Sequence, residues 1–416
     1  MAADGRADAR ELPARRGRLT SPTVDRAARI LIVRGYQVTP WELRPWELLP
    51  KDRFDVGYLR LARNWFDDSA LSLRRFPVKA VSSYLPRGRI GVLTTGVTGD
   101  RYVDADEAFA WADVVHAAEL SYWFAGDAAR RKQQNRYKLA LTVWETIPFL
   151  DVYRNRYARA YRRETLAATD LFLPATERAR QALLLEGVEQ ERTEVVRPGI
   201  DVDRFSAAPR PDAPPIEHLV VSPGRLVWEK GHQDVMRALV ALRRGLVAGA
   251  DAPRFRLLIV GRGPEETRLR RYAEELGIAD AVEFRAVPYD EMPAVFASAS
   301  CMVLASLATA SGGYFLGDIP RFFWEEQFGL VLAEAMAAGL TIVASQSGAI
   351  AEVCGDEAAY FLPGDWLGLA RRLAEGPFSR PPGETSREPV ERSRLYSTTA
   401  AAGQLAAVYD RLLDRS

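Results

Sequence analysis

Short runs of apolar residues alternate along the chain with longer segments in which apolar residues recur at helical spacing. In the first half, the apolar runs are residues 30–33, 91–93, 114–115, 139–143, 171–173 and 195–196, and helical patterns include residues 154–168 and 177–186. Apolar strands that alternate with helices are typical of a parallel sheet covered on both faces. We therefore expect the first half to form a doubly wound α/β domain.

The same alternation stops and restarts once. Four prolines fall within residues 207–215, a composition typical of a stiff linker. Apolar runs follow at residues 218–222, 256–261, 281–284, 301–305 and 341–345, with helical patterns at 233–244 and 329–338. The sequence thus predicts an α/β fold of two Rossmann-like domains, residues 27–206 and 217–396, joined by the linker 207–216. Ligands of such sheets bind at the carboxyl ends of the strands, so the cleft between the domains is the expected site.

Composition excludes several classes of protein. Lys and Arg number 56 against 55 Asp and Glu, and this balance argues against a general nucleic-acid binder. Two cysteines and three scattered histidines are too few for a disulfide framework or a four-ligand zinc site. Residues 1–26 are rich in Ala, Arg and Asp and lack the apolar core of a secretory signal, so we expect a disordered tail and a cytoplasmic protein.

A glycine turn with two nearby cations follows the first strand of the second domain. The segment runs Ser222-Pro-Gly224-Arg225-Leu-Val-Trp-Glu-Lys230-Gly, and a helix begins directly after it. Two cations beside a helix N-terminus form a natural site for a diphosphate. A loop with solvated charges is the alternative.

A pair of glutamates spaced by seven residues follows later in the second domain. Glu334 lies in a helical segment that is otherwise Leu, Val, Ala and Met, where a carboxylate is costly without partners. Glu326 lies just before Phe328-Gly329-Leu330, where a loop enters this helix and backbone N–H groups are free. The alternative is an acid favoured by the helix dipole and an acid on an exposed face.

These motifs together resemble those of a known enzyme family. In order, they are Val196-Arg-Pro-Gly-Ile-Asp-Val-Asp-Arg-Phe205, Gly224-Arg-Leu with Lys230-Gly, Val260-Gly-Arg-Gly-Pro264, Glu326-x7-Glu334 and Ser347-Gly-Ala-Ile-Ala-Glu352. The set resembles the retaining, GT-B-fold glycosyltransferases of family 4. The resemblance is dense from Val196 to Asp365. It implies transfer of a hexosyl group from a nucleotide-diphosphate sugar to an acceptor hydroxyl, and a C-terminal helix (397–416) that packs on the N-terminal domain.

The resemblance also implies residue roles. Arg225 and Lys230 would hold the diphosphate and stabilise the leaving group, and Glu334 would hydrogen-bond the donor ribose. Glu326 would contact the transferred sugar, helped by backbone N–H groups of Phe328, Gly329 and Leu330. Such an enzyme needs fixed cations where negative charge develops and electron-rich groups near the anomeric carbon.

The first half departs from the family pattern. Many members carry a glycine pair after the first strand, where this chain has the single Gly35. Two histidines of the family are replaced by Ala118 and Trp144, and Glu119 and Glu145 follow them directly. Either acid would then contact the sugar or the acceptor, or be structural. The missing histidines also leave open a catalytically inactive relative that binds nucleotide sugars as a regulator or assembly partner.

No cofactor or metal is expected, because Arg225 and Lys230 supply the counter-charge. Asp104-Ala-Asp106 and Asp201-Val-Asp203 match the Asp-x-Asp pattern of other glycosyltransferases. The first lies at an expected helix start, where acids are common, and the resemblance makes the second structural.

Three further expectations concern partners. The acceptor is a carbohydrate, a lipid-linked molecule or a small molecule. Arginines and tyrosines in residues 153–163, and basic residues in 130–138, indicate either a solvated face or contact with an anionic acceptor or the inner face of a membrane. Residues 307–323, with Gly312-Gly313, are expected to form a lid or acceptor wall.

Overall fold

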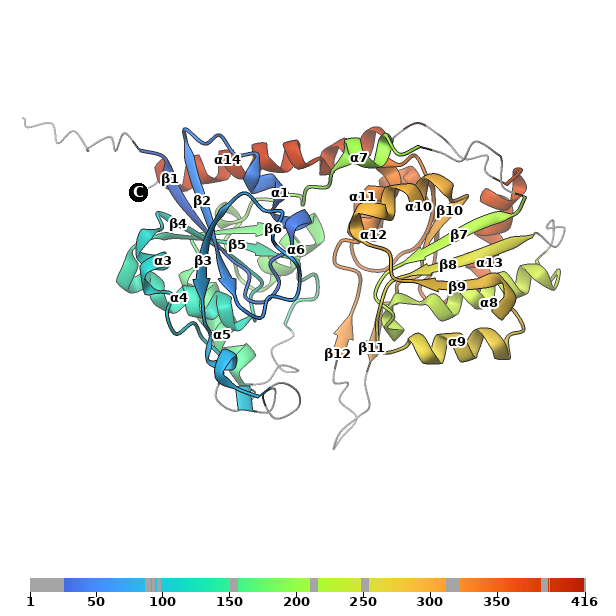
Figure 1. Cartoon of the computed structure of the whole chain (residues 1–416), viewed down its shortest axis with the longest axis horizontal. Helices are drawn as coiled ribbons and strands as arrows, with labels where there is room; N and C mark the ends of the chain where they lie inside the picture. Colours follow the sequence, from blue (N-terminus) through green and yellow to red (C-terminus); the bar gives the residue numbers. More distant parts are fainter. Residues whose placement is uncertain are drawn as a thin grey trace, which may run out of the picture.

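Two parallel sheets of six strands each organise the chain. The computed structural model describes residues 26–86, 91, 94–95, 99–149, 156–209, 216–247, 254–311, 322–382, 388 and 390–414. Figure 1 shows the two sheets side by side, each with its own helices. This arrangement confirms the expected α/β architecture of two Rossmann-like units.

The N-terminal sheet has the strand order β3-β2-β1-β4-β5-β6. Its strands are β1 (Ala28–Val33), β2 (Phe54–Leu61), β3 (Arg74–Val78), β4 (Val114–Ala118), β5 (Lys138–Val143) and β6 (Leu171–Pro174). The helices of this half are α1 (Pro40–Glu47), α3 (Asp106–Trp111), α4 (Trp123–Asn135), α5 (Arg156–Ala168) and α6 (Glu177–Leu185). The strand order reverses between β1 and β4, where such sheets open a crevice for ligands.

The C-terminal sheet has the order β14-β13-β10-β7-β8-β9. Its strands are β7 (His218–Pro223), β8 (Phe255–Val260), β9 (Val282–Arg285), β10 (Cys301–Leu304), β13 (Thr341–Ser345) and β14 (Ala358–Phe361). The helices are α7 (Val202–Ser206), α8 (His232–Arg243), α9 (Glu266–Glu275), α10 (Met292–Ser298), α11 (Leu330–Ala337), α12 (Ile350–Cys354) and α13 (Trp366–Glu375). Here the order reverses between β10 and β7, so the loop after β7 borders the second crevice.

Each sheet is buried on both faces. Along β1, Ile30 and Ile32 pack into one apolar cluster, and Leu31 and Val33 pack into another on the opposite face. Successive strand residues point to opposite faces, so a strand covered on both sides must be apolar throughout. This is the physical reason why unbroken apolar runs identified the central strands.

The last helix, α14 (Thr398–Asp414), packs against α1 and completes one face of the N-terminal domain. In Figure 1 it is the red helix that runs back across that domain. The buried Tyr409 hydroxyl accepts from Trp46 Nε1 at 2.7 Å and lies 2.6 Å from His116 Nδ1. Burial lowers the pKa of His116 well below its ordinary value, so the ring is neutral, and its Nε2 lies 2.7 Å from Thr142 Oγ1. His116 is therefore a structural residue of this face.

Several expected strands differ from the observed ones. Gly91 is helical, so the strand expected at 91–93 is wrong at that residue, and Val92 and Leu93 lie outside the described residues. Residues 195–196 form no strand. The N–H groups of Glu194 and Val196 donate to carbonyls of β6. The sequence pattern missed β2, β3 and β14.

The expected disordered tail lies outside the described residues except for Arg26, and so does most of the linker, residues 210–215. Ala207 to Pro209 lead out of α7, and Ile216 leads into β7. Among the helices in the described ranges, none is both long and apolar enough to cross a membrane.

Candidate functional site

A cleft of about 530 Å³ lies between the carboxyl ends of the two sheets. Its lining brings together eight of the residues expected from the sequence, which are Glu119, Gly224, Arg225, Lys230, Glu326, Phe328, Gly329 and Leu330. Three other expected residues, Gly35, Glu145 and Glu334, are not among the described residues of this lining. Figure 1 shows the two domains on either side of it.

The loop after β7 is fixed by contacts between backbones. Gly224 has φ +151°, and a Cβ on Gly261 would lie 1.9 Å from the Gly224 carbonyl oxygen. Only glycine permits this approach. The loop then presents Arg225, whose side chain is 66% exposed, and Lys230, whose side chain is 13% exposed.

His232, at the start of α8, stabilises this loop through two hydrogen bonds. Its Nδ1 lies 2.8 Å from Ser222 Oγ, and its Nε2 lies 3.1 Å from the Arg225 carbonyl oxygen. Burial lowers the pKa of His232 to about 4, so the neutral ring donates from Nε2 and accepts from Ser222. The sequence did not predict this role of His232, because only the two cations and the helix start of the segment indicated a ligand site.

Glu326 and Lys230 form an ion pair inside the cleft wall. Lys230 Nζ lies 2.6 Å from Glu326 Oε2, and Ser306 Oγ donates to the same oxygen at 2.6 Å. Ser347 Oγ accepts from the Glu326 backbone N–H at 3.1 Å. A buried ion pair tolerates the loss of one partner poorly, because the other charge is left without compensation. The sequence did not indicate Ser306, and it gave Ser347 as part of a motif without a role.

The first turn of α11 forms the adjoining wall. Gly329 precedes it with φ +77°, and no side chain caps the helix. The first N–H groups of a helix have no carbonyl one turn back to bind, and here the Leu332 N–H donates to the Gly329 carbonyl oxygen at 2.9 Å. Phe328 is buried between Trp144 of the other domain and Tyr396, with ring centroids 5.9 and 5.3 Å away. The N-terminus of α11 therefore faces the cleft and favours an anionic ligand group.

Glu334 lies beneath this wall, and 4% of it is exposed. It shares a hydrogen bond with Tyr289, and burial raises its pKa to about 7. The Tyr289 ring stacks on Trp41 from the N-terminal domain at 5.3 Å. Glu334 is not among the described residues of the cleft lining, so its expected contact with a donor ribose stays a prediction.

On the N-terminal side, Glu119 lines the cleft with φ +63° and accepts from the Trp144 N–H at 2.8 Å. It thus positions Trp144, the residue that replaces a family histidine. Glu145 is half-buried outside the lining. Gly35 has φ +57° and lies against the Phe124 ring, which a Cβ would meet at 2.5 Å.

Two further contacts tie the domains together. Arg178 of α6 forms a bidentate pair with Glu325, at 2.6 and 2.8 Å, next to Glu326 in the chain. Glu352 of α12 accepts from the N–H groups of Glu177 and Arg178 at 2.6 and 3.0 Å. A carboxylate of one domain thereby caps a helix of the other.

The two Asp-x-Asp motifs have structural partners. Asp104 accepts from the Lys79 N–H at 2.6 Å, and Asp106 pairs with Arg131. Asp201 caps α7 through the Arg204 N–H at 3.2 Å. Within the part of the chain that the structure describes, no group of His, Cys, Asp or Glu side chains is arranged to hold a metal ion.

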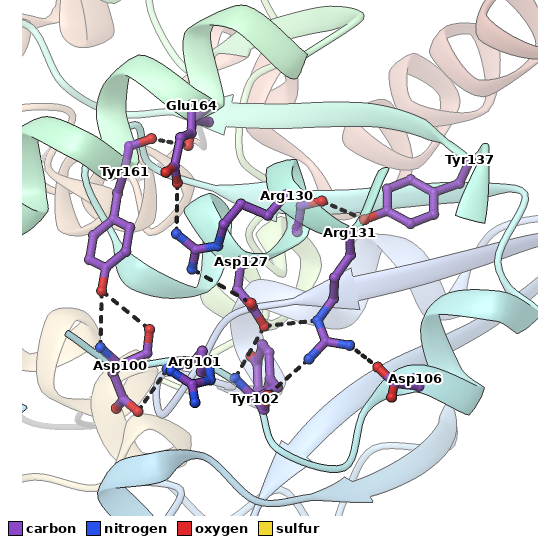
Figure 2. A network of polar contacts seen from close by, with 12 residues as sticks. Asp100, Arg101, Tyr102, Asp106, Asp127, Arg130, Arg131, Tyr137, Tyr161 and Glu164 are labelled. Carbon is purple, nitrogen blue, oxygen red and sulfur yellow. Dashed lines mark hydrogen bonds and ion pairs between the residues drawn. The ribbon is translucent and has the colours of Figure 1, made fainter. Parts of the chain in front are cut away.

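The basic clusters are partly neutralised. Figure 2 shows Arg130 paired with Glu164 and Arg131 paired with Asp127 and Asp106. Arg162, expected on a basic surface, is instead 1% exposed and pairs with Glu186. It was misassigned because the helical pattern did not reveal which arginine turns inward. Arg156, Arg159 and Arg163 are exposed.

The expected lid is described in part. β11 (Thr309–Ser311) pairs in antiparallel fashion with β12 (Phe322–Trp324). The N–H of Leu307 donates to the Glu229 carbonyl oxygen at 2.8 Å, which joins the lid to the Arg225 loop. Residues 312–321, including Gly312 and Gly313, lie outside the described residues.

Comparison with known proteins extends over both domains. Residues 23–204 match the family model described as Glycosyltransferase Family 4, and residues 206–375 match Glycosyl transferases group 1. A GDP-mannose-dependent alpha-(1-6)-phosphatidylinositol monomannoside mannosyltransferase of Mycolicibacterium smegmatis is 36% identical over 169 residues, which are 38% of this chain. D-inositol 3-phosphate glycosyltransferase 2 of Catenulispora acidiphila is 27% identical over 267 residues, or 60% of this chain. The chain spans 40% and 57% of the length of these two relatives.

Solved structures share the whole fold. The sucrose-phosphate synthase of Thermosynechococcus elongatus has a TM-score of 0.67 and 18% identity, over 94% of this chain and 100% of its own. Anabaena HepE, solved with UDP and glucose, has a TM-score of 0.66 and 16% identity, over 92% of this chain and 99% of its own. These likenesses confirm the GT-B architecture.

Proposed function

Because the chain belongs to the family 4, group 1 glycosyltransferases, we propose that it transfers a hexosyl group from a nucleotide-diphosphate sugar to an acceptor hydroxyl, with retention of anomeric configuration. One observation carries this proposal. Arg225, Lys230 and the N-terminus of α11 converge on the same cleft as Glu326.

The reaction breaks the bond between the anomeric carbon and the diphosphate oxygen and forms a bond from that carbon to the acceptor oxygen. The hydroxyl proton leaves the acceptor, and the diphosphate departs with negative charge. Arg225, Lys230 and the N–H groups of α11 stabilise this charge, and Lys230 and the N–H groups are held in place before the reaction begins. Glu326 stands beside them and favours positive charge at the sugar.

Lys230 has two roles in this scheme. Without a donor it neutralises Glu326 at 2.6 Å, and with a donor it also faces the diphosphate. The ion pair thus keeps the lysine extended toward the cleft, which reduces the side-chain entropy lost on binding. No metal ion is part of the proposal.

The names of relatives support a nucleotide-sugar donor without fixing its base. The mannosyltransferase named above is GDP-mannose-dependent, and HepE was solved with UDP and glucose. The exposed Arg156, Arg159 and Arg163 support contact with the inner face of an anionic membrane as part of the same proposal.

Donor binding and turnover test the proposal in sequence. Thermal unfolding is measured with UDP-, GDP- and ADP-sugars, because a bound ligand raises apparent stability by RT ln(1 + [L]/Kd). The donor that stabilises the protein is then supplied with a panel of acceptors, and free nucleoside diphosphate and the anomeric configuration of the product are measured. The matched variant is Glu326→Gln.

We expect stabilisation by one donor, release of its nucleoside diphosphate and loss of turnover in Glu326→Gln. Stabilisation without turnover on any acceptor, with equal values for Glu326→Gln, would point to the inactive nucleotide-sugar binder. Absence of stabilisation by every donor would contradict both.

A further inference from the structure

A second cavity, of about 520 Å³, lies wholly in the N-terminal domain beside the cleft. Six aromatic side chains contribute to its described lining, namely Tyr36, Trp65, Tyr122, Trp123, Tyr157 and Tyr161. We call it the aromatic pocket. Trp65 lines both the aromatic pocket and the cleft, so the two cavities share a wall.

The aromatic pocket occupies the crevice that the sheet topology predicts. Tyr36 follows β1, and Tyr122 and Trp123 follow β4, the two neighbouring strands between which the order reverses. Trp65 comes from the loop after β2. Parallel sheets bind ligands at this point of reversal, beyond the carboxyl ends of the strands.

Two aromatic residues of the lining are partly exposed to solvent. Trp65 is 67% exposed and Tyr122 is 42% exposed. Trp65 stacks on Tyr36 with ring planes 13° apart, and Tyr36 in turn contacts Trp123 at 5.9 Å. Aromatic side chains gain free energy when they are buried. A group of exposed aromatic side chains at a cavity therefore indicates a surface that a ligand covers.

A fixed polar edge runs along one wall. The Tyr36 hydroxyl, Ser82 Oγ and the Asp100 carboxylate are linked by hydrogen bonds. Tyr161 holds this edge in place, since its hydroxyl accepts from the Asp100 N–H at 2.9 Å, as Figure 2 shows. Such an edge offers oxygen atoms that can accept from the hydroxyl groups of a ligand.

The charges of the lining balance. It contains one cation, Arg63, and one anion, Asp100, among the residues that the structure describes. Arg63 Nη1 donates to the carbonyl oxygens of Ser82 and Leu85, both at 3.1 Å, which ties the guanidinium to the wall. At the margin, Arg156 donates to the Tyr157 hydroxyl at 2.8 Å. A phosphate group generally needs a cluster of available cations, and the fixed Asp100 carboxylate opposes it.

We propose that the aromatic pocket binds an uncharged saccharide, and that this saccharide is the part of the acceptor next to the reacting hydroxyl. A sugar ring has an apolar face of C–H groups that packs on aromatic rings and an edge of hydroxyl groups that meets Tyr36, Ser82 and Asp100. The cavity volume suits a ligand of one to a few rings. The proposal rests on the transferase function proposed above, and it gives that function an uncharged acceptor.

Saccharide binding is measured directly, in the absence of a donor, by saturation-transfer NMR and calorimetry on the full chain. The probes are uncharged 4-nitrophenyl glycosides and mono- to trisaccharides, each compared with the same sugar carrying a 6-phosphate. The variants are Tyr122→Ala and Trp65→Ala. The matched control is Tyr84→Ala, since Tyr84 is 65% exposed in the same domain but is not part of the described lining.

We expect uncharged probes to bind more tightly than their phosphates, and Tyr122→Ala to weaken binding about tenfold, the order of one lost stacking contact. Tyr84→Ala should bind like the unaltered protein. Stabilisation by the nucleotide-sugar donor should not change in Tyr122→Ala or Tyr84→Ala. Circular dichroism identifies any misfolding of Trp65→Ala, and Tyr122→Ala then carries the test alone.

Tighter binding of the phosphorylated sugars, or equal affinities in Tyr122→Ala and Tyr84→Ala, would overturn the proposal. Binding of anionic vesicles without binding of any saccharide would overturn it as well. Failure of the donor to stabilise the unaltered protein is a separate result, and it would contradict the transferase function.

Discussion

Tyr289 and Glu334 share a hydrogen bond under the wall of the cleft, and this hydrogen bond favours the charged form of the Glu334 carboxyl. Burial outweighs the hydrogen bond and raises the pKa of Glu334 from 4.5 to about 7. The carboxyl is thus retained at a site where it weakens the fold at neutral pH, as is common for groups kept for function.

Glu334→Gln should stabilise the protein more at pH 8 than at pH 5. Between pH 4.5 and pH 7 the folded state binds more protons than the unfolded chain, so the free energy of unfolding falls as pH rises through this window. The shift corresponds to a loss of about 3 kcal/mol above pH 7. Glutamine cannot ionise and avoids this loss.

The measurement is urea unfolding of both proteins at pH 5 and pH 8. The altered hydrogen bond to Tyr289 contributes at both pH values and cancels in the comparison. Equal differences at the two pH values would mean that Glu334 titrates near its ordinary value.

Arg225→Ala and Lys230→Ala should both lower kcat, but only the second should lower stability. Each removes one preorganised donor, which costs about 2.7–4 kcal/mol of transition-state stabilisation. The Arg225 side chain is 66% exposed, so its loss leaves the fold intact. Loss of Lys230 leaves Glu326 as a buried charge without its partner.

Steady-state kinetics and thermal unfolding separate the two effects. Arg268→Ala is the control, because the Arg268 side chain is 81% exposed and also pairs with a nearby glutamate, Glu265. The double variant Lys230→Ala, Glu326→Gln should recover stability without recovering activity. Normal turnover in Arg225→Ala would place the diphosphate elsewhere.

Glu326→Gln and Glu334→Gln should change different kinetic constants. Glu326 faces the cleft beside Lys230, so its loss should lower kcat, because its interaction with the sugar strengthens in the transition state. Glu334 is assigned to the ribose, remote from the breaking bond, so its loss should mainly raise KM for the donor. Initial rates at saturating acceptor give both constants. The same pattern in both variants would refute the assigned roles.

The strongly apolar strands and the glycine-dependent loops could be predicted from the sequence. Burial on both faces requires an unbroken run of apolar residues, and close backbone contacts require glycine. β3 could not, since four of its five residues are not fully buried and it contains Pro77. An edge strand of this kind lacks both the apolar run and a regular alternation.

The sequence predicted those residues of the candidate site that belong to sequence motifs. Ser306 and Tyr289 come from separate segments and contact Glu326 and Glu334 only through the fold, and Trp41 stacks on Tyr289. Arg162 illustrates the opposite error. Nearby arginines on α5 are exposed, whereas Arg162 is buried and forms an ion pair with Glu186, which comes from a separate segment.

Arg178→Ala should loosen the contact between the domains while each domain stays folded. The Arg178–Glu325 pair joins α6 to the segment that carries Glu326, and half of the arginine side chain is exposed. We expect a larger radius of gyration in small-angle X-ray scattering and a higher KM for the donor, because the cleft walls separate. Arg180→Ala is the control, since Arg180 pairs within α6. An unchanged radius of gyration together with an unchanged KM would mean that other contacts hold the domains.

Activity should persist in EDTA. Arg225 and Lys230 line the cleft with the N-terminus of α11, so cationic groups of the chain face the diphosphate. Nucleoside diphosphate release is measured with EDTA and after addition of Mn²⁺. Loss of activity in EDTA and its recovery with Mn²⁺ would show that a metal ion takes part.

Tyr409 lies on the last helix but belongs to the core of the N-terminal domain, so this domain cannot be completed until the last helix has been synthesised. The last strand of the N-terminal sheet ends at Pro174, whereas the helix that covers one of its faces begins at Thr398. While the ribosome synthesises the second domain, Trp46 and His116 of the first domain therefore lack their hydrogen-bond partner, Tyr409. The N-terminal domain is completed only after α14 has been made, so a premature stop codon before residue 398 would damage the domain that was made first.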